Sequence, residues 1–135
     1  MFSFNWKSRY CVGVKQLDAQ HQALMGSLNQ LHEVMMGGNV DDAAGPLIRK
    51  LTLLSHEHFA TEETLMESTG FPGLADHRPR HQELNMKVGE FIARYENGDK
   101  AVYSQFMYFV RDWFSKHMVK EDHEYAPWMA ERGVR

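Results

Sequence analysis

The sequence of 135 residues contains one cysteine, Cys11. A single cysteine excludes an intrachain disulfide framework and every site that needs several thiolates, such as a cysteine-ligated zinc knuckle, an iron–sulfur cluster or a C-x-x-C-H haem attachment. The chain also has no run of about 18 apolar residues, so the sequence predicts no membrane-spanning helix. The opening segment Met1–Lys7 lacks an apolar stretch and a small-residue cleavage site, and we therefore expect a cytoplasmic protein.

An excess of positive charge is absent as well. The formal net charge is −3, which gives no electrostatic basis for binding nucleic acid. Hydrophobic residues make up 43% of the chain and charged residues 24%, which is the balance of an ordinary globular domain. Because a chain of this length usually forms one core, we expect a single domain over residues 1–135.

Apolar residues recur at alternating steps of three and four along four segments of the chain. This spacing is typical of helices that share a core. The segments are separated by the helix-breaking sequences Gly37-Gly38-Asn39, Gly70-Phe71-Pro72-Gly73 and Asn97-Gly98-Asp99. Short connections favour an all-α, antiparallel up-down-up-down four-helix bundle. We expect an N-terminal arm at 1–16, a four-helix core at 17–117, and a C-terminal segment at 118–135 that contains a short helix after the break at Ala126-Pro127.

Seven polar side chains occupy positions where these helices are expected to bury apolar residues. They are His21, His58, Glu62, His77, His81, His117 and Asp122. In a bundle whose helices alternate in direction, these positions all fall at the same end. Imidazole and carboxylate groups in an apolar core cost several kcal/mol or more unless something pairs with them. We therefore interpret the seven as metal ligands, and His32, His56 and His123 as surface residues or outer partners.

The spacing within the set supports this interpretation. His58 and Glu62, like His77 and His81, are four residues apart, so each pair lies on one face of its helix, one turn apart. His117 and Asp122 are five apart, which an ideal α-helix does not bring to one face. The sequence therefore predicts a π-type turn or a local break between them.

The composition of the set limits the metal. Imidazole and carboxylate ligands without sulfur suit iron or manganese, and seven ligands suit two octahedral ions that share bridging carboxylates. Zinc prefers four ligands, and the H-E-x-x-H motif of zinc proteases is absent. The Glu-x-x-His repeats of di-iron carboxylate oxygenases are absent too. A histidine-rich set carries less negative charge than an oxygenase site, which favours reversible ferrous–ferric chemistry.

The order of these seven residues resembles the hemerythrin family, specifically the single-domain bacteriohemerythrins. The opening Val12-Gly13-Val14 and Leu17-Asp18-Ala19-Gln20-His21 is similar to that family's opening. The resemblance implies two non-haem iron ions joined by Glu62, Asp122 and an oxo or hydroxo bridge. One iron would be held by His77, His81 and His117. The other, held by His21 and His58, would keep an open position for dioxygen.

The resemblance implies reversible dioxygen binding, as a carrier or store, in a protein that is not an enzyme. An alternative is a di-iron enzyme or sensor that acts on peroxide or nitric oxide. Dioxygen is the expected partner, nucleic acid and membrane insertion are not, and the function leaves room for an oxygen-consuming protein that receives the gas. Apolar residues that match the family's oxygen pocket are Leu24, Phe59, Trp113, Phe114 and Met118. Candidates for hydrogen bonds around the site are Gln20, Glu57, Glu63 and Tyr125.

Overall fold

The computed structural model of the protein describes residues 10–37, 40–99 and 101–135, except for the side chains of residues 40–43. This part of the chain is all-helical. Its four long helices are α1 (Lys15–Met36), α2 (Val40–Thr69), α3 (Leu74–Glu96) and α4 (Val102–Lys116). A π-helical turn (His117–Glu121), a 3-10 turn (Asp122–Glu124) and the short helix α5 (Ala126–Glu131) follow. None of the described helices combines the length and apolarity that crossing a bilayer requires.

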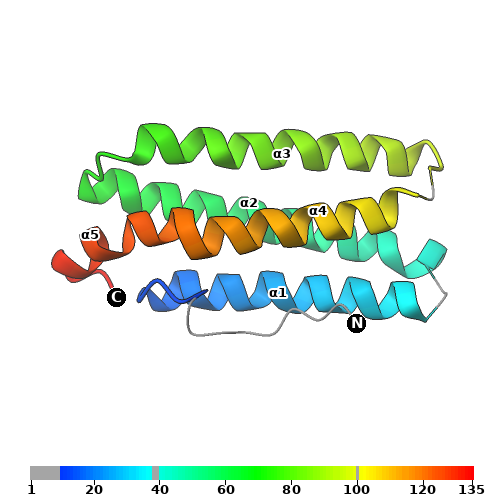
Figure 1. Ribbon diagram of the computed structural model, residues 1–135, viewed down its shortest axis with the longest axis horizontal. Coiled ribbons are helices and arrows are strands. Elements are labelled where there is room, and N and C mark those ends of the chain that lie inside the picture. The colour runs from blue at the N-terminus through cyan, green and yellow to red at the C-terminus, as the bar shows by residue number, and fades with distance from the viewer. Residues whose placement is uncertain (1–9, 38–39, 100) are drawn as a thin grey trace.

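The four long helices lie side by side and alternate in direction (Figure 1). Helix α1 packs against α2 and α4, and α3 packs against the same two helices. Each long helix is therefore next to the one that follows it in the chain, and α4 closes the ring against α1. The expected antiparallel four-helix bundle with a short C-terminal helix is confirmed.

Glycines in the left-handed region end two of the long helices. Gly70, with φ of 71°, follows α2, and Gly98, with φ of 82°, follows α3. The turn after α2 is closed by the Phe71 N–H, which donates to the Met66 carbonyl at 2.9 Å. The corresponding bond after α3 joins the Asp99 N–H to the Arg94 carbonyl at 3.0 Å. These tight C-terminal turns reverse the chain within a few residues, and a side chain with a Cβ would be strained at either glycine.

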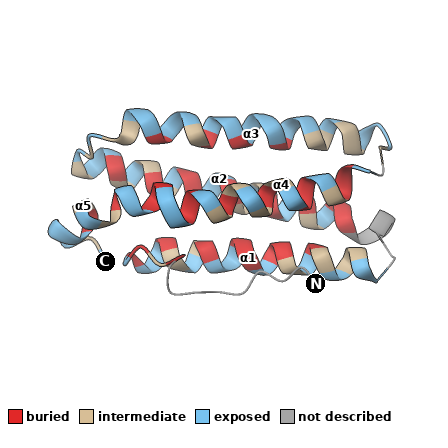
Figure 2. Ribbon diagram, viewed as in Figure 1, coloured by how far each residue is buried: buried red, intermediate tan, exposed pale blue. Residues whose placement is uncertain are grey.

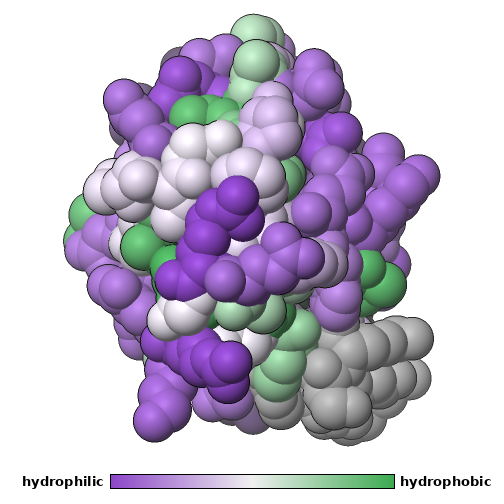
Figure 3. All heavy atoms as spheres, turned by 90° about the vertical axis from the view of Figure 1, so that its left-hand side faces the viewer, coloured by the Kyte–Doolittle hydropathy of each residue, from purple (hydrophilic) through white to green (hydrophobic). Residues whose placement is uncertain are grey.

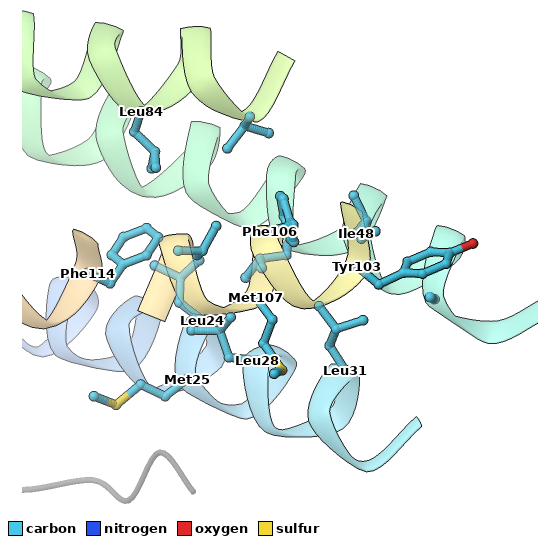
Figure 4. Close-up of a cluster of buried hydrophobic side chains, with 14 of the residues drawn as sticks. Leu24, Met25, Leu28, Leu31, Ile48, Leu84, Tyr103, Phe106, Met107 and Phe114 are labelled. Carbon is cyan, nitrogen blue, oxygen red and sulfur yellow. The ribbon is translucent and has the colours of Figure 1, made fainter. Parts of the chain in front are cut away.

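Most of the apolar core lies between the four long helices. Buried residues form a stripe along the inner face of each helix, as the helical period requires (Figure 2). Leu24, Leu28 and Leu31 of α1 point toward the interior, where Phe106 and Phe114 of α4 also lie (Figure 4). All five are at most 1% exposed.

A second apolar cluster lies at the end of the bundle that carries α5. Its buried members are Val12, Val14, Leu17, Met66, Tyr125 and Met129. The surface at this end is mostly hydrophilic, with apolar side chains in small separate areas (Figure 3). On α1, His21 comes between Leu17 of this second cluster and Leu24 of the main core. His21 thus has apolar side chains on both sides along the bundle.

Several details differ from the expected helical pattern. The helical spacing predicts Leu65 as the last buried residue of α2, but the buried residue there is Met66, and Leu65 is only half-buried. For Pro79 the sequence predicts either a place in the first turn of α3 or a kink, and the residue lies in the second turn. Of the expected N-terminal arm, residues 1–9 lie outside the described residues, whereas Tyr10 is buried in the main core. Small rotations of a helix about its axis account for the first difference, because adjacent apolar residues compete for one core position.

Two glycines lie inside the long helices at positions where a side chain would meet open space. Gly26 in α1 and Gly89 in α3 are exposed, and a Cβ added at either would meet no neighbour within 4 Å. Since glycine weakens a helix interior, we expect Gly26→Ala and Gly89→Ala each to stabilise the fold by roughly 0.5–1 kcal/mol. Urea unfolding followed by circular dichroism measures the change. A lower unfolding midpoint in both variants would contradict the helix assignment.

Candidate metal centre

The structure brings together all seven polar residues that the sequence singled out. Each is at most 1% exposed. His21 comes from α1, and the pairs His58/Glu62 and His77/His81 come from α2 and α3. His117 opens the π-helical turn and Asp122 begins the 3-10 turn. Five elements of the chain therefore contribute to one buried layer, at the end of the bundle where α5 lies.

The layer divides into two groups of potential metal ligands that share one carboxylate. The first contains Glu62, His77, His81 and His117, and the second contains His21, His58, Glu62 and Asp122. In each group one ligand atom per residue lies within 4.8 Å of the others. Since Glu62 belongs to both, two ions held by these groups would be neighbours.

The five imidazoles all direct Nε2 into the layer. His21 Nε2 lies 2.9 Å from His58 Nε2, and His81 Nε2 lies 3.1 Å from His117 Nε2. Ligand atoms bound at about 2.1 Å to one metal ion and at right angles to each other are about 3 Å apart. The ring nitrogens therefore stand at the separation of adjacent ligands around one ion.

Both buried carboxylates lie between the two groups of histidines. Asp122 Oδ1 is 2.9 Å from His117 Nε2, while Oδ2 is 3.1 Å from His21 Nε2. Glu62 Oε1 is 3.1 Å from His81 Nε2 and 3.5 Å from His58 Nε2. These three oxygens nevertheless have no partner in hydrogen-bond geometry. Buried polar atoms are normally satisfied, so the arrangement is that of donors aimed at cations between them.

The predicted π-type turn is confirmed between His117 and Asp122. The N–H of Asp122 donates to the carbonyl of His117, five residues earlier. This wider turn brings positions five residues apart onto one side of the helix. As a result Asp122 faces the layer together with His117, and Glu121 reaches the outer nitrogen of the same imidazole.

Tyr125 anchors the shared carboxylate from the α5 end of the bundle. Its hydroxyl donates to Glu62 Oε2 at 2.5 Å, and the side chain is completely buried. Burial, followed by the nearby Asp122 and Glu62 carboxylates, holds the pKa of Tyr125 well above its usual value. The phenol therefore remains a hydrogen-bond donor, and it fixes Glu62 so that Oε1 faces the histidines.

Outer partners orient four of the five imidazoles through Nδ1. His81 and His117 each have a carboxylate oxygen at 2.9 Å, from Glu63 and Glu121 respectively. His58 has the amide oxygen of Gln20 at 2.8 Å, and His21 has the backbone carbonyl of Tyr10 at 3.3 Å. The buried Nδ1 of His77 has no hydrogen-bond partner. Such partners fix both the ring orientation and the tautomer that presents Nε2 to a metal.

The expected outer partners are thus found in part. Gln20 and Glu63 lie where the sequence placed them, and Glu57 is exposed on the outside of α2. Sequence reasoning missed Glu121, although it stands four residues after His117, the same step that pairs His58 with Glu62. It missed Tyr10 because a backbone carbonyl carries no side-chain signal.

The charges of the layer are strongly coupled. Burial alone would raise the pKa of Glu62 and of Asp122, yet the surrounding histidines hold both pKa values well below their usual range. Burial opposes the charged form of His77, but Asp122 and Glu62 overcome it and raise its pKa to about 9. For His58, burial dominates and lowers the pKa to about 4. The layer therefore has ionised carboxylates that attract positive charge.

Aromatic rings cover the layer on the side of the main core. The ring of Phe59 stacks on His81 with centroids 3.9 Å apart, and Trp113 stacks on His117 at 4.4 Å. Phe114 lies 6.1 Å from Phe59, ring centroid to ring centroid. The remaining expected pocket residues, Leu24 and Met118, belong to the same apolar cluster and are fully buried. Trp113 is half-buried and so also reaches the surface.

Comparison with known proteins agrees with this geometry. Residues 12–129 match the sequence model of the hemerythrin HHE cation binding domain. The chain is 29% identical over 121 residues to a bacteriohemerythrin of Stenotrophomonas maltophilia, covering 90% of this chain and 78% of the relative. It is 30% identical over 110 residues to a bacteriohemerythrin of Methylococcus capsulatus, covering 82% and 83%.

A solved structure extends the comparison to three dimensions. The crystal structure of a wild-type hemerythrin superposes with a TM-score of 0.84 at 28% identity, covering 91% of this chain and 95% of that one. The matched sequence region includes all seven residues of the buried layer. The chain belongs to the hemerythrin family.

Proposed function

We propose that this protein binds dioxygen reversibly, as a carrier or store, at a non-haem di-iron centre. The observation that carries the proposal is the pair of buried histidine and carboxylate groups that share Glu62. The bacteriohemerythrins among its relatives support the same function.

The residues present fit two iron ions. Five imidazole nitrogens and two carboxylates without sulfur are the ligand types that iron accepts in reversible redox sites. The buried oxygens of Asp122 and Oε1 of Glu62, which have no hydrogen-bond partner, are the atoms that metal ions would satisfy. In our proposal Glu62 and Asp122 would hold both ions, because each carboxylate lies between the two groups of histidines.

The two groups of ligands differ in a way that suits binding of a gas. His77, His81 and His117 give one ion three imidazoles, whereas His21 and His58 give the other only two. We therefore propose that His21 and His58 would leave room for dioxygen at the ion they hold. When bound, the iron pair would supply electrons to dioxygen. For this transfer to be reversible, the protein must keep water and protons away from the site.

The apolar cover provides that exclusion. Phe59, Phe114 and Met118 are at most 3% exposed, and Figure 4 shows Leu24 and Phe114 facing the interior from α1 and α4. A site enclosed in this way denies protons and external reductants to bound oxygen, which favours release over further reaction. We propose that Leu24, Phe59, Trp113, Phe114 and Met118 line the oxygen pocket.

Oxygen cycling tests the proposal directly. Anaerobically reduced protein should contain two irons per chain, develop a visible charge-transfer band in air and lose it when oxygen is removed. The cycle should repeat with the same amplitude, because an enclosed site returns to its starting state. Absorption spectroscopy with iron analysis measures both. A band that forms once and decays irreversibly would favour the alternative, a di-iron enzyme acting on peroxide or nitric oxide.

Opening the pocket should shorten the life of the oxygenated form. Phe114→Ala removes a fully buried ring beside Phe59 and admits water, so we expect oxidation of the oxygenated form to become several-fold faster. Phe106→Ala is the matched control, since it removes an equally buried ring about 12 Å away along α4. The decay of the charge-transfer band gives both rates. Equal rates in Phe114→Ala and the unmodified protein would remove Phe114 from the pocket.

Metal uptake should release protons. His77 in the apoprotein has a pKa raised to about 9 and carries a proton at pH 7, whereas a metal binds the neutral imidazole. The apparent affinity for a divalent ion should therefore rise from pH 6.5 toward pH 9. Over the same interval the free energy of unfolding of the apoprotein should fall, because a raised histidine pKa stabilises the fold only while the proton is bound.

Calorimetric titration in two buffers of different ionisation enthalpy measures the released protons, and urea unfolding of the apoprotein at both pH values measures stability. Binding without proton release at pH 7 would contradict the predicted charge state of His77.

A further inference from the structure

The outer partners of the imidazoles differ between the two groups of ligands. In the group of His77, His81 and His117, two imidazoles face carboxylates, Glu63 and Glu121. In the group of His21 and His58, both imidazoles face neutral oxygens, an amide and a peptide carbonyl. The two halves of the layer are thus unequal in charge just outside the ligands.

Arginines from one short stretch of α3 hold both outer carboxylates in place. Arg78 Nε donates to Glu63 Oε1 at 2.7 Å, while the other oxygen of Glu63 faces His81 Nδ1 at 2.9 Å. Arg80 Nε lies 2.7 Å from Glu121 Oε2, whose partner oxygen faces His117 Nδ1 at 2.9 Å. In both cases an arginine contacts a carboxylate at 2.7 Å and that carboxylate contacts an imidazole at 2.9 Å. One carboxylate comes from α2 and the other from the π turn.

The position of these carboxylates suits them for acting on the imidazoles. The side chain of Glu121 is 12% exposed and that of Glu63 is 23% exposed, so solvent screens them only in part. A carboxylate that accepts the Nδ1 proton of a metal-bound histidine increases the electron density at Nε2 and strengthens the bond to the metal. Neutral acceptors orient the ring without adding negative charge.

We infer that Glu63 and Glu121 are positioning residues that make the two metal sites unequal, so that the site of His77, His81 and His117 binds the first ion and binds it more tightly. This inference rests on the proposed di-iron function and deepens it. It assigns the tight site to the ion that the proposal treats as fully coordinated. The ion beside His21 and His58 is then the more weakly held of the two.

Stepwise titration of the apoprotein with Co²⁺ at fixed pH tests the inference. Two dissociation constants should be resolved from the visible absorption, and the first ion should shift the Nδ1–H signals of His81 and His117 in proton NMR spectra. Glu63→Gln and Glu121→Gln keep the shape of each side chain and remove its charge. Each should weaken the tighter site by about 10- to 100-fold and leave the weaker constant nearly unchanged.

Two matched controls separate this effect from a change in surface charge. Glu67 lies 3.9 Å from Arg78, and Glu124 lies 3.3 Å from Arg80, so both contact the same arginines as the outer carboxylates. Their exposed side chains are not among the outer partners of the histidines. Glu67→Gln and Glu124→Gln should therefore reproduce the constants of the unmodified protein.

A variant that is expected to bind metal more tightly distinguishes the charge effect from damage to the fold. Gln20→Glu places a carboxylate against His58 Nδ1, where the amide oxygen now lies at 2.8 Å. The Thr61 hydroxyl now accepts from Gln20 at 3.0 Å and donates to the Glu57 carbonyl at 2.9 Å. It can turn from that carbonyl to donate to the introduced group. We expect this variant to tighten the weaker site by about tenfold, which damage to the fold would not do.

The outcomes separate this inference from the proposed function. Titration curves for Glu63→Gln and Glu121→Gln that match the unmodified protein, or a first ion that shifts the signals of His21 and His58, would overturn the inference. Repeated oxygen cycling of the iron-loaded protein would still support the proposed function in that case. An apoprotein that takes up no Co²⁺ and no iron would overturn both.

Discussion

The structure depends on balancing the charge of a polar layer buried between two apolar clusters. Seven imidazole and carboxylate side chains are at most 1% exposed, and the cost of removing such groups from water is several kcal/mol for each one left unpaired. Hydrogen bonds satisfy polar atoms on the outside of the layer. The side chains that form them are Tyr125, Glu63, Glu121 and Gln20. On the inside, Glu62 Oε1 and both oxygens of Asp122 lack hydrogen-bond partners, and this is where the proposed cations would bind.

The topology of the fold brings the residues of this layer together. Because the four long helices alternate in direction (Figure 1), residues near the start of α1 and α3 meet residues near the end of α2 and α4. The π turn after α4 adds the last carboxylate, Asp122, at a position that a regular α-helix would turn away. Apolar residues on either side along the bundle then limit access of water, and rings such as Phe59 and Trp113 stack directly on the imidazoles.

Much of this arrangement could be predicted from the sequence. The helical period identified His21, His58 and His81 as polar residues at positions expected to be buried. The five-residue step from His117 to Asp122 required the irregular turn that the structure contains. The periodicity did not distinguish Leu65 from Met66 as the buried residue, because both lie close to the same face of α2. Glu121 had a usable pattern that the prediction did not apply to it, because it stands four residues after His117. The role of Tyr10 rests on a backbone carbonyl, which has no side-chain pattern.

The central claim is that two neighbouring metal ions satisfy the inside of the buried layer. Anomalous diffraction at the iron absorption edge, from crystals of protein purified without oxygen, tests it most directly. The account predicts two iron peaks in each chain, one among Glu62, His77, His81 and His117 and the other among His21, His58, Glu62 and Asp122. Crystals of iron-loaded protein with no peak in this layer, or with the iron elsewhere on the chain, would contradict it.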